Sequence, residues 1–188
     1  MSSPIATPLR ELVPQPFDLL LALEARAVAA TPATGIAAGT DEWVGVAFRL
    51  GTESLLAARE DTREVLAVPP RLTRVPGARS WIRGLHNVRG QLLPVIDLRQ
   101  FLGGGATPIQ RQSRLLVVQH REVPAALLVD EVLGFRRFPE ATFVAEPPPM
   151  LLRCEHYLAG VFRRETETWP VFSLRRLVES PAFLAAAR

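Results

Sequence analysis

An internal repeat is the feature that most constrains the fold of this chain. The segment LLPVIDLRQFL at 92–102 aligns without gaps to TWPVFSLRRLV at 168–178, with matching Pro, Val, Leu and Arg positions. The same offset places Gly84 on Gly160. Because a repeated sequence encodes a repeated structural unit, we expect two halves with the same fold.

A second pair of matching segments locates the limits of the repeat. REVL at 63–66 resembles DEVL at 130–133 at a shorter offset, which indicates an insertion in the second half within 140–149. We therefore expect half-domains at about 43–105 and about 112–180, divided near the glycine-rich segment GGGATP.

Short apolar runs separated by glycine, proline and charged residues follow one another from Trp43 onward. The first run, WVGVAFRL, alternates so that one face carries Val44, Val46, Phe48 and Leu50. This alternation predicts a half-buried strand. Regularly spaced short strands with few helical segments predict a mainly β protein with closed or sandwiched antiparallel sheets.

Residues 1–42 differ in composition from the rest of the chain. PFDLLLALEARAVAA is rich in Leu and Ala, and Asp18 is suited to an N-cap, which predicts an amphipathic helix at about 17–30. The small residues that follow predict a linker. We interpret 1–42 as an extension, 43–180 as the β domain and 181–188 as a C-terminal tail.

A β-hairpin is predicted within the first half. Residues 82–88 and 91–96 are two strand candidates joined by Arg89-Gly90. Glycine at the second turn position supplies the positive φ of a tight hairpin, so we expect Arg89 at the hairpin tip. Pro94 cannot donate a ladder hydrogen bond, so its strand is expected at an edge, at a bulge, or where pairing ends on one side.

Helix-capping residues follow the repeated strands. Asp97, with Gln100 three residues later, forms a capping-box pattern that predicts a short helix ending at Gly103. Its inward residues are expected to be Leu98, Phe101 and Leu102. Ser173 stands at the same place in the second half and is the second expected cap.

Composition limits the classes of partner and compartment. The chain contains no lysine, so its net charge of +3 comes from 22 arginines against 19 acidic residues, spread through the sequence. A nucleic-acid binder would carry a larger or clustered surplus. The single cysteine, Cys154, agrees with a reducing compartment, and the short apolar run at 19–23 predicts no membrane insertion. We expect a cytoplasmic protein.

Catalytic and metal-binding patterns are not found in the sequence. His86, His120 and His156 lie in different predicted strands or turns, and no nucleophile is placed beside a base. Cys154 and His156 lack a second ligand pair, so we expect no metal and no cofactor. Asp97 and Asp130 are interpreted as structural. The sequence thus predicts a β-rich binding module that is not an enzyme.

Binding of single-stranded nucleic acid is the alternative from another class, because small β-barrels perform it with exposed aromatic side chains and arginines. The aromatic residues are expected to point inward, however, as judged from Phe48, Phe101, Phe143 and Phe172. We keep this function as a distant alternative and expect no nucleic-acid partner.

Several motifs together resemble the CheW-like domain of bacterial chemosensory adaptors. These motifs, in chain order, are REVLAVP, VPG, GLHNVRGQLLPVIDL and LLVDEVLGF, and the likeness runs from Trp43 to Val178. The extension before Trp43 is similar to that of the PilI branch, the adaptors of type IV pilus chemosensory systems.

This resemblance implies a fold and a function. The fold would be two pseudo-symmetric five-stranded SH3-like β-barrels side by side. The function would be that of a non-enzymatic cytoplasmic scaffold, recruited to membrane-associated receptor arrays, which couples the cytoplasmic tip of a methyl-accepting chemoreceptor to a CheA-type histidine kinase. Control of twitching motility is the expected output, and a flagellar chemotaxis adaptor is the alternative.

The resemblance also implies partner-binding residues. Carried over by position, these are Thr62, Glu64, Gly84, Asn87, Arg89 and Gly90. Ser173 departs from the family, in which many members have an aspartate there, but it exchanges one capping residue for another. The surface that would meet the kinase is not assigned to residues.

Overall fold

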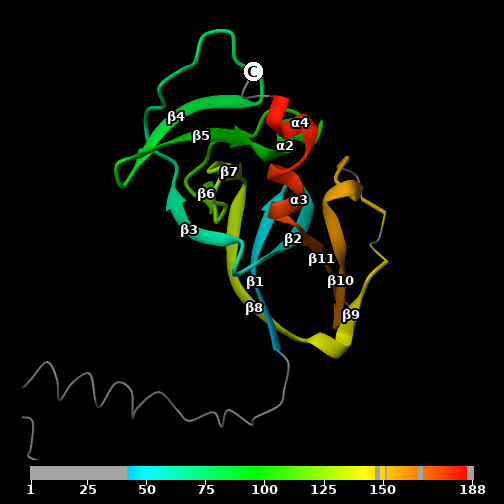
Figure 1. The fold of residues 1–188 in the computed structure, drawn as a ribbon. Coiled ribbons are helices and arrows are strands. Elements are labelled where there is room, and N and C mark those ends of the chain that lie inside the picture. Colours follow the sequence, from blue (N-terminus) through cyan, green and yellow to red (C-terminus); the bar gives the residue numbers. More distant parts are fainter. Residues whose placement is uncertain (1–41, 147–148, 151, 165–166, 186–188) are drawn as a thin grey trace, which may run out of the picture. The chain divides into compact units, whose positions relative to one another are not determined.

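The structure is a computed structural model, and it describes residues 42–146, 149–150, 152–164 and 167–185 (Figure 1). The helix expected at 17–30 and the linker after it lie outside these residues. Everything described belongs to one compact unit, which contains the whole predicted β domain.

Two β-sheets make up this unit, as the mainly β expectation requires. The six-stranded sheet has the order β8-β1-β2-β11-β10-β9. Its strands are β1 (Glu42–Leu50), β2 (Glu53–Ala58), β8 (Glu131–Pro139), β9 (Phe143–Val144), β10 (Leu158–Arg164) and β11 (Glu167–Phe172). The five-stranded sheet has the order β3-β6-β7-β5-β4. Its strands are β3 (Thr62–Ala67), β4 (Ile82–Val88), β5 (Gln91–Asp97), β6 (Arg114–Val118) and β7 (Ala126–Val129).

The repeat seen in the sequence is a repeat of sheet topology. The order β4-β5-β7-β6-β3 in one sheet corresponds to β10-β11-β2-β1-β8 in the other, and each contains one parallel pair, β5 with β7 and β11 with β2. Each sheet therefore takes two consecutive strands from one half of the sequence and its remaining strands, three in the five-stranded sheet and four in the six-stranded sheet, from the other. The segments 43–105 and 112–180 are repeats in sequence, but neither forms a sheet by itself.

One strand departs from the expected count of five per barrel. The additional strand, β9, lies within the insertion at 140–149 and pairs with β10 through Val144 and Val161. At the equivalent place in the five-stranded sheet, Thr73 and Leu85 form an isolated bridge. The insertion has extended this bridge into a sixth strand.

The repeated glycines explain how that bridge forms. Gly84 and Gly160 have φ of +143° and +158°, and each lies at a register shift in its strand pair. A Cβ on Gly84 would lie 2.5 Å from the carbonyl oxygen of Thr73. On Gly160 it would meet the carbonyl oxygen of Val144 equally closely. Glycine is required because the backbone of the preceding loop approaches the strand at this point.

A hydrophobic core shared by both sheets holds the unit together. It combines Val46, Phe48 and Leu50 of β1 with residues of β6 and β7, including Leu116 and Leu127. The expected apolar face of β1 is therefore correct, but the expectation of a half-buried strand is wrong. Ala47 on the opposite face is also buried, in a second cluster inside the six-stranded sheet. β1 lies between two layers of protein, so both of its faces are covered.

Short helices follow the last strand of each repeat. α2 (Leu98–Phe101) begins after Asp97, which accepts a hydrogen bond from Gln100 N at 3.1 Å. α3 (Leu174–Val178) begins after Ser173, which accepts from Arg176 N at 3.2 Å. Both expected caps are confirmed. The described residues also contain two 3₁₀ turns, Glu140–Thr142 and Glu155–Tyr157.

The last described helix, α4 (Pro181–Leu184), differs from the expected tail at 181–188. Its Phe183 is only 4% exposed and packs against Trp81 and Phe101. The sequence reads as a tail because the helix is a single turn, and its burial depends on aromatic residues from the other half of the chain.

Three further expectations concern single residues. Pro94 pairs with Leu85 of β4, while the parallel pairing of β5 with β7 begins only at Val95, so pairing does end at Pro94 on one side. Asp130 accepts a hydrogen bond from Gly51 N at 2.7 Å, which confirms its structural role. Phe143, expected to point inward, is 39% exposed, because β9 is the outermost strand of its sheet.

The shared core predicts that the two sheets unfold together. We expect a single transition in chemical denaturant, with coincident fluorescence and circular dichroism curves, because neither sheet retains its core without the other. Burial raises the pKa of the Cys154 thiol to about 11, and Cys154 belongs to the shared core. A thiol reagent should therefore modify Cys154 only as the whole unit unfolds. Separate transitions, or modification before unfolding, would show that the sheets are independent.

The close approach at Gly84 predicts a large effect of adding one methyl group. Gly84→Ala should lower the free energy of unfolding by roughly 2–3 kcal/mol, because the loop backbone must move away from the strand. Gly77→Ala is the matched control, since Gly77 has φ of +73° and open space around its Cβ position. Its cost should be about 1 kcal/mol from backbone conformation alone. Equal losses in the two variants, measured by denaturant titration, would contradict this account.

Candidate partner-binding groove

The tip of the β4–β5 hairpin has the geometry of a type I′ turn. Arg89 and Gly90 have φ of +52° and +86°, and Asn87 Oδ1 accepts a hydrogen bond from Gly90 N at 2.8 Å. Both central residues of such a turn need positive φ, which is unusual for arginine. Asn87 thus shapes the turn, and Arg89 is held at its tip with a 75% exposed side chain.

Two side-chain contacts connect this tip to strand β3. Arg89 Nη2 lies 3.0 Å from Glu64 Oε2, and Arg63 Nη1 donates to Gln91 Oε1 at 2.8 Å. The Glu64 side chain is only 14% exposed, so its carboxylate is held against the protein while the arginine remains accessible. The ion pair positions the guanidinium of Arg89 beside β3.

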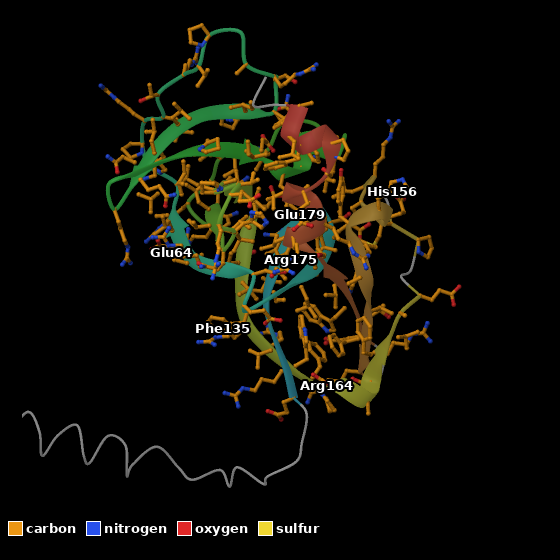
Figure 2. The ribbon with its side chains drawn as sticks, in the orientation of Figure 1. Glu64, Phe135, His156, Arg164, Arg175 and Glu179 are labelled. Carbon is orange, nitrogen blue, oxygen red and sulfur yellow. The ribbon has the colours of Figure 1, made fainter. Side chains whose placement is uncertain are left out.

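A groove of about 460 Å³ lies next to this ion pair, where the edge of one sheet meets the edge of the other. β3 and β8 are edge strands, and both contribute to the lining. The lining residues are Val46, Arg59, Thr62, Arg63, Glu64, Val65, Gln119 and Phe135. Figure 2 shows Glu64 and Phe135 on the same side of the unit. We call this feature the β3–β8 groove.

Exposed apolar side chains accompany the charged groups of the groove. Phe135 is 62% exposed and Val65 is 37% exposed. Leu92, paired with Asn87 in the hairpin and outside the groove lining, is 59% exposed. Large apolar groups close together at a surface are typical of a protein-binding site. The groove therefore offers both apolar contact and charge.

Phe135 is the groove residue that the sequence analysis missed. The run LGFRRF looks like any other apolar strand segment with charges. In the structure, pairing between β1 and β8 shifts between Ala47 and Phe48, so that Leu133 has no partner of its own. Such a bulge changes which face later residues occupy, and a simple alternation of two cannot anticipate it.

Five of the six residues expected to bind a partner are placed at the groove or at the hairpin tip: Thr62, Glu64, Asn87, Arg89 and Gly90. Gly84 is the exception. It is buried, and it lies five residues before Arg89 on the hairpin, roughly 16 Å away at about 3.3 Å per residue. The structure gives Gly84 a role in the fold and does not bring it to the groove.

A second charged cluster lies around a hollow of about 760 Å³, between the turn after β6 and helix α3. Its ionisable members include Glu60, Asp61, His120, Arg175 and Glu179. His120 Nε2 lies 3.4 Å from Glu179 Oε1. Burial, followed by repulsion from Glu60, raises the pKa of the Asp61 carboxyl above its usual 3.8. Folding therefore disfavours the ionised form of Asp61 relative to the unfolded chain.

The described part of the chain contains neither a cluster of metal ligands nor a helix able to cross a membrane. Within these residues, no three His, Cys, Asp or Glu side chains gather as metal ligands would. No described helix has the length and apolar character needed to cross a bilayer.

Comparison with known proteins places this geometry in context. The CheW-like domain family model matches residues 44–182. Protein PilI of Pseudomonas aeruginosa is 40% identical over 178 residues, which cover 93% of this chain and 98% of PilI. Protein FrzA of Myxococcus xanthus is 39% identical over 103 residues, covering 55% of this chain and 62% of FrzA.

Among solved structures, the scaffolding protein TtCheW from Thermoanaerobacter tengcongensis superposes with a TM-score of 0.64 at 26% identity. The match covers 74% of this chain and 94% of TtCheW. Chemotaxis protein CheW of Thermotoga maritima is 33% identical over 88 residues, covering 47% of this chain and 58% of that protein.

The raised pKa of Asp61 predicts the pH dependence of one substitution. A carboxyl whose pKa is higher in the folded state contributes stability at low pH that is lost as the pH rises through the folded pKa. Asp61→Asn should therefore raise the melting temperature near pH 7 and lose this advantage below pH 3.8, the usual pKa. The exposed Glu122→Gln serves as control and should change little. A lower melting temperature for Asp61→Asn near pH 7 would contradict the assignment.

Proposed function

Because this chain belongs to the CheW-like domain family, we propose that it is a non-enzymatic adaptor in a chemosensory pathway. In this role it couples the cytoplasmic tip of a methyl-accepting chemoreceptor to the regulatory domain of a CheA-type histidine kinase. It acts in the cytoplasm and is recruited to membrane-associated receptor arrays.

The observation that carries the proposal is the β3–β8 groove. An amphipathic helix binds through an apolar stripe with charged residues beside it, and a groove with exposed apolar groups next to charges is complementary to such a surface. Phe135 and Val65 supply the apolar contact, and Arg89 supplies an accessible guanidinium already oriented by Glu64. A receptor tip built from helices is a suitable occupant.

The extent of similarity favours the pilus pathway over the flagellar one. The alignment with PilI covers 93% of this chain, so it includes most of the extension before Glu42. The alignment with CheW of Thermotoga maritima covers less than half. We therefore propose control of twitching motility, with a flagellar chemotaxis adaptor as the alternative. Deleting the gene and scoring twitching and swimming separately distinguishes the two.

The groove predicts that reversing one charge uncouples the adaptor without unfolding it. In Arg89→Glu, two carboxylates would face each other at the hairpin tip, but Arg89 is mostly exposed, so stability should fall by about 1 kcal/mol or less. Receptor binding should weaken roughly 30-fold or more, because losing one partner of a buried charge contact between proteins costs about 2–5 kcal/mol. Co-sedimentation with receptor and kinase, beside thermal melting, measures both effects.

Two further variants make this experiment decisive. Phe135→Ser leaves every charge of the groove in place and should also weaken receptor binding, because it removes apolar contact area. Arg163→Glu, an exposed arginine in the β10–β11 hairpin of the other sheet, is the matched control and should bind normally. Normal receptor binding by both Arg89→Glu and Phe135→Ser, with unchanged melting temperatures, would remove the groove from the proposal.

A further inference from the structure

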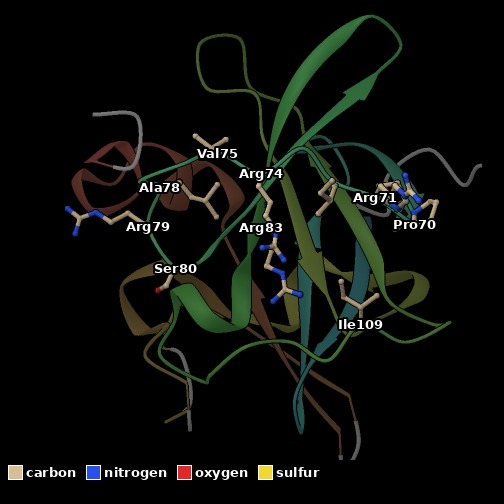
Figure 3. A pocket seen from close by; sticks show the side chains of 12 residues that line it. Pro70, Arg71, Arg74, Val75, Ala78, Arg79, Ser80, Arg83 and Ile109 are labelled. Atoms are coloured by element: carbon tan, nitrogen blue, oxygen red, sulfur yellow. The ribbon is translucent and has the colours of Figure 1, made fainter.

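The loop between β3 and β4 forms a second surface, at residues 68–81, together with Arg83 and Ile109. It surrounds a hollow of about 660 Å³ (Figure 3). The residues that line the hollow include Arg71, Arg74, Arg79 and Arg83, and no carboxylate is among them. We call it the arginine surface. Arg83 lies near the start of β4 and Arg89 follows the end of the same strand, so these two arginines are about 20 Å apart at roughly 3.3 Å per residue.

The positive charge of this surface is largely uncompensated. Arg83 lies 3.5 Å from Asp97, a buried carboxylate that also accepts hydrogen bonds from Gln100 and Thr107. Within the described residues, no side-chain hydrogen bond or ion pair engages the other three guanidiniums, those of Arg71, Arg74 and Arg79. Elsewhere in the unit, arginines such as Arg49 and Arg89 face glutamates. A concentration of unpaired arginines favours an anionic partner.

Apolar groups lie among these arginines. Val75 is 39% exposed and Ile109 is 48% exposed, and Leu72 and Ala78 contribute to the lining. Figure 3 shows Arg74 and Arg83 near the centre of the hollow, with Arg71 and Arg79 toward opposite sides. A small anion would be held by guanidiniums that converge on one point. Spread charges with exposed aliphatic groups between them instead suit an extended partner that carries both acidic and apolar side chains.

The fold holds this loop in place, so the surface is formed before a partner binds. Thr73 exchanges two backbone hydrogen bonds with Leu85, at 3.0 and 2.7 Å. Ala78 N donates to Val75 O, and Ile82 N donates to Arg79 O. Gly84 permits the close approach described above. An ordered loop loses less entropy on binding than a disordered one.

The charge of the loop is not required by the fold. The equivalent segment of the second repeat, 139–157, forms the same kind of contact through Val144 and Gly160. It contains Glu140, Glu146 and Glu155 against the single arginine Arg153. Since both segments meet the same structural requirement with opposite charge balance, the strand contact does not explain the arginines of the first.

We propose that the arginine surface docks an acidic segment of a partner protein, in which carboxylates alternate with aliphatic side chains. The carboxylates pair with Arg71, Arg74 and Arg79, and the aliphatic groups cover Val75 and Ile109. The β3–β8 groove is a separate site, because the two surfaces have no lining residue in common and Arg89 lies at the opposite end of β4 from Arg83. This docking site is independent of the proposed receptor contact.

Fluorescence anisotropy with a labelled peptide in which Glu and Leu alternate tests this proposal on the full chain. The peptide should bind, and a peptide of alternating Lys and Leu should not. The double variant Arg74→Glu/Arg79→Glu should weaken binding about tenfold or more, and raising the salt from about 50 to about 300 mM should weaken binding to the unsubstituted chain. Ile109→Ser should also weaken binding, without changing the salt dependence.

Matched controls distinguish binding at this site from a general effect of the protein's positive charge. Arg163→Glu/Arg164→Glu, at exposed arginines of β10, should bind the peptide normally, and so should the groove variant Arg89→Glu. Loss of peptide binding in Arg89→Glu would show that the groove and the arginine surface act as one site, and would overturn the proposal. So would unchanged binding by the Arg74→Glu/Arg79→Glu variant with a native melting temperature.

Other occupants of the arginine surface give distinct results. Displacement of the peptide by tripolyphosphate or by phosphatidylglycerol vesicles, together with normal binding by Ile109→Ser, would make this a general polyanion site. A dimer that forms without peptide and disappears in Arg74→Glu/Arg79→Glu would assign the surface to a second copy of the chain. Either result would overturn the proposal. The receptor assay with Arg89→Glu is unaffected by either, so the proposed function is tested separately.

Discussion

The apolar core shared by the two sheets is the interaction on which the rest of the structure depends. β1 and β2 from one sheet and β6 and β7 from the other direct alternate residues into it, while their opposite faces line the interiors of the individual sheets. Strands buried on both faces cannot be separated without exposing a large apolar area to water. These four strands are also the ones that the two halves of the sequence exchange. β1 and β2 complete the sheet formed by strands of the second half, and β6 and β7 complete the sheet formed by strands of the first half.

This rigid centre leaves the edges and loops free to differ. Both repeats keep a capped helix after the parallel strand and a glycine where the preceding loop touches the sheet. What differs is the chemistry added to these common positions. One loop carries arginines and the other carries glutamates and an additional strand, β9. Duplication thus supplied the same scaffold twice, and the exposed segments of each copy carry different charges.

The candidate binding surfaces lie where the scaffold has unsatisfied or accessible groups. The β3–β8 groove is at two sheet edges, and the arginine surface is on a loop fixed at its ends by backbone hydrogen bonds. A scaffold whose function is to hold partners in register benefits from sites on ordered segments, because little entropy is lost when they bind. The two surfaces have no lining residue in common.

The sequence by itself determined those features that depend on near neighbours in the chain. The hairpin at Arg89-Gly90, the caps at Asp97 and Ser173 and the repeat itself follow from turn chemistry, capping geometry and alternation over a few residues. Only the tertiary structure decided the exchange of strands, the burial of both faces of β1 and of Gly84, the docking of α4 and the exposure of Phe135. Each of these depends on contacts between residues far apart in the chain, or on a bulge that reverses alternation. The ion pair of Glu64 and Arg89 depends on both the sequence and the tertiary structure. Their positions are visible in the sequence, but their pairing required β3 and the hairpin to meet in space.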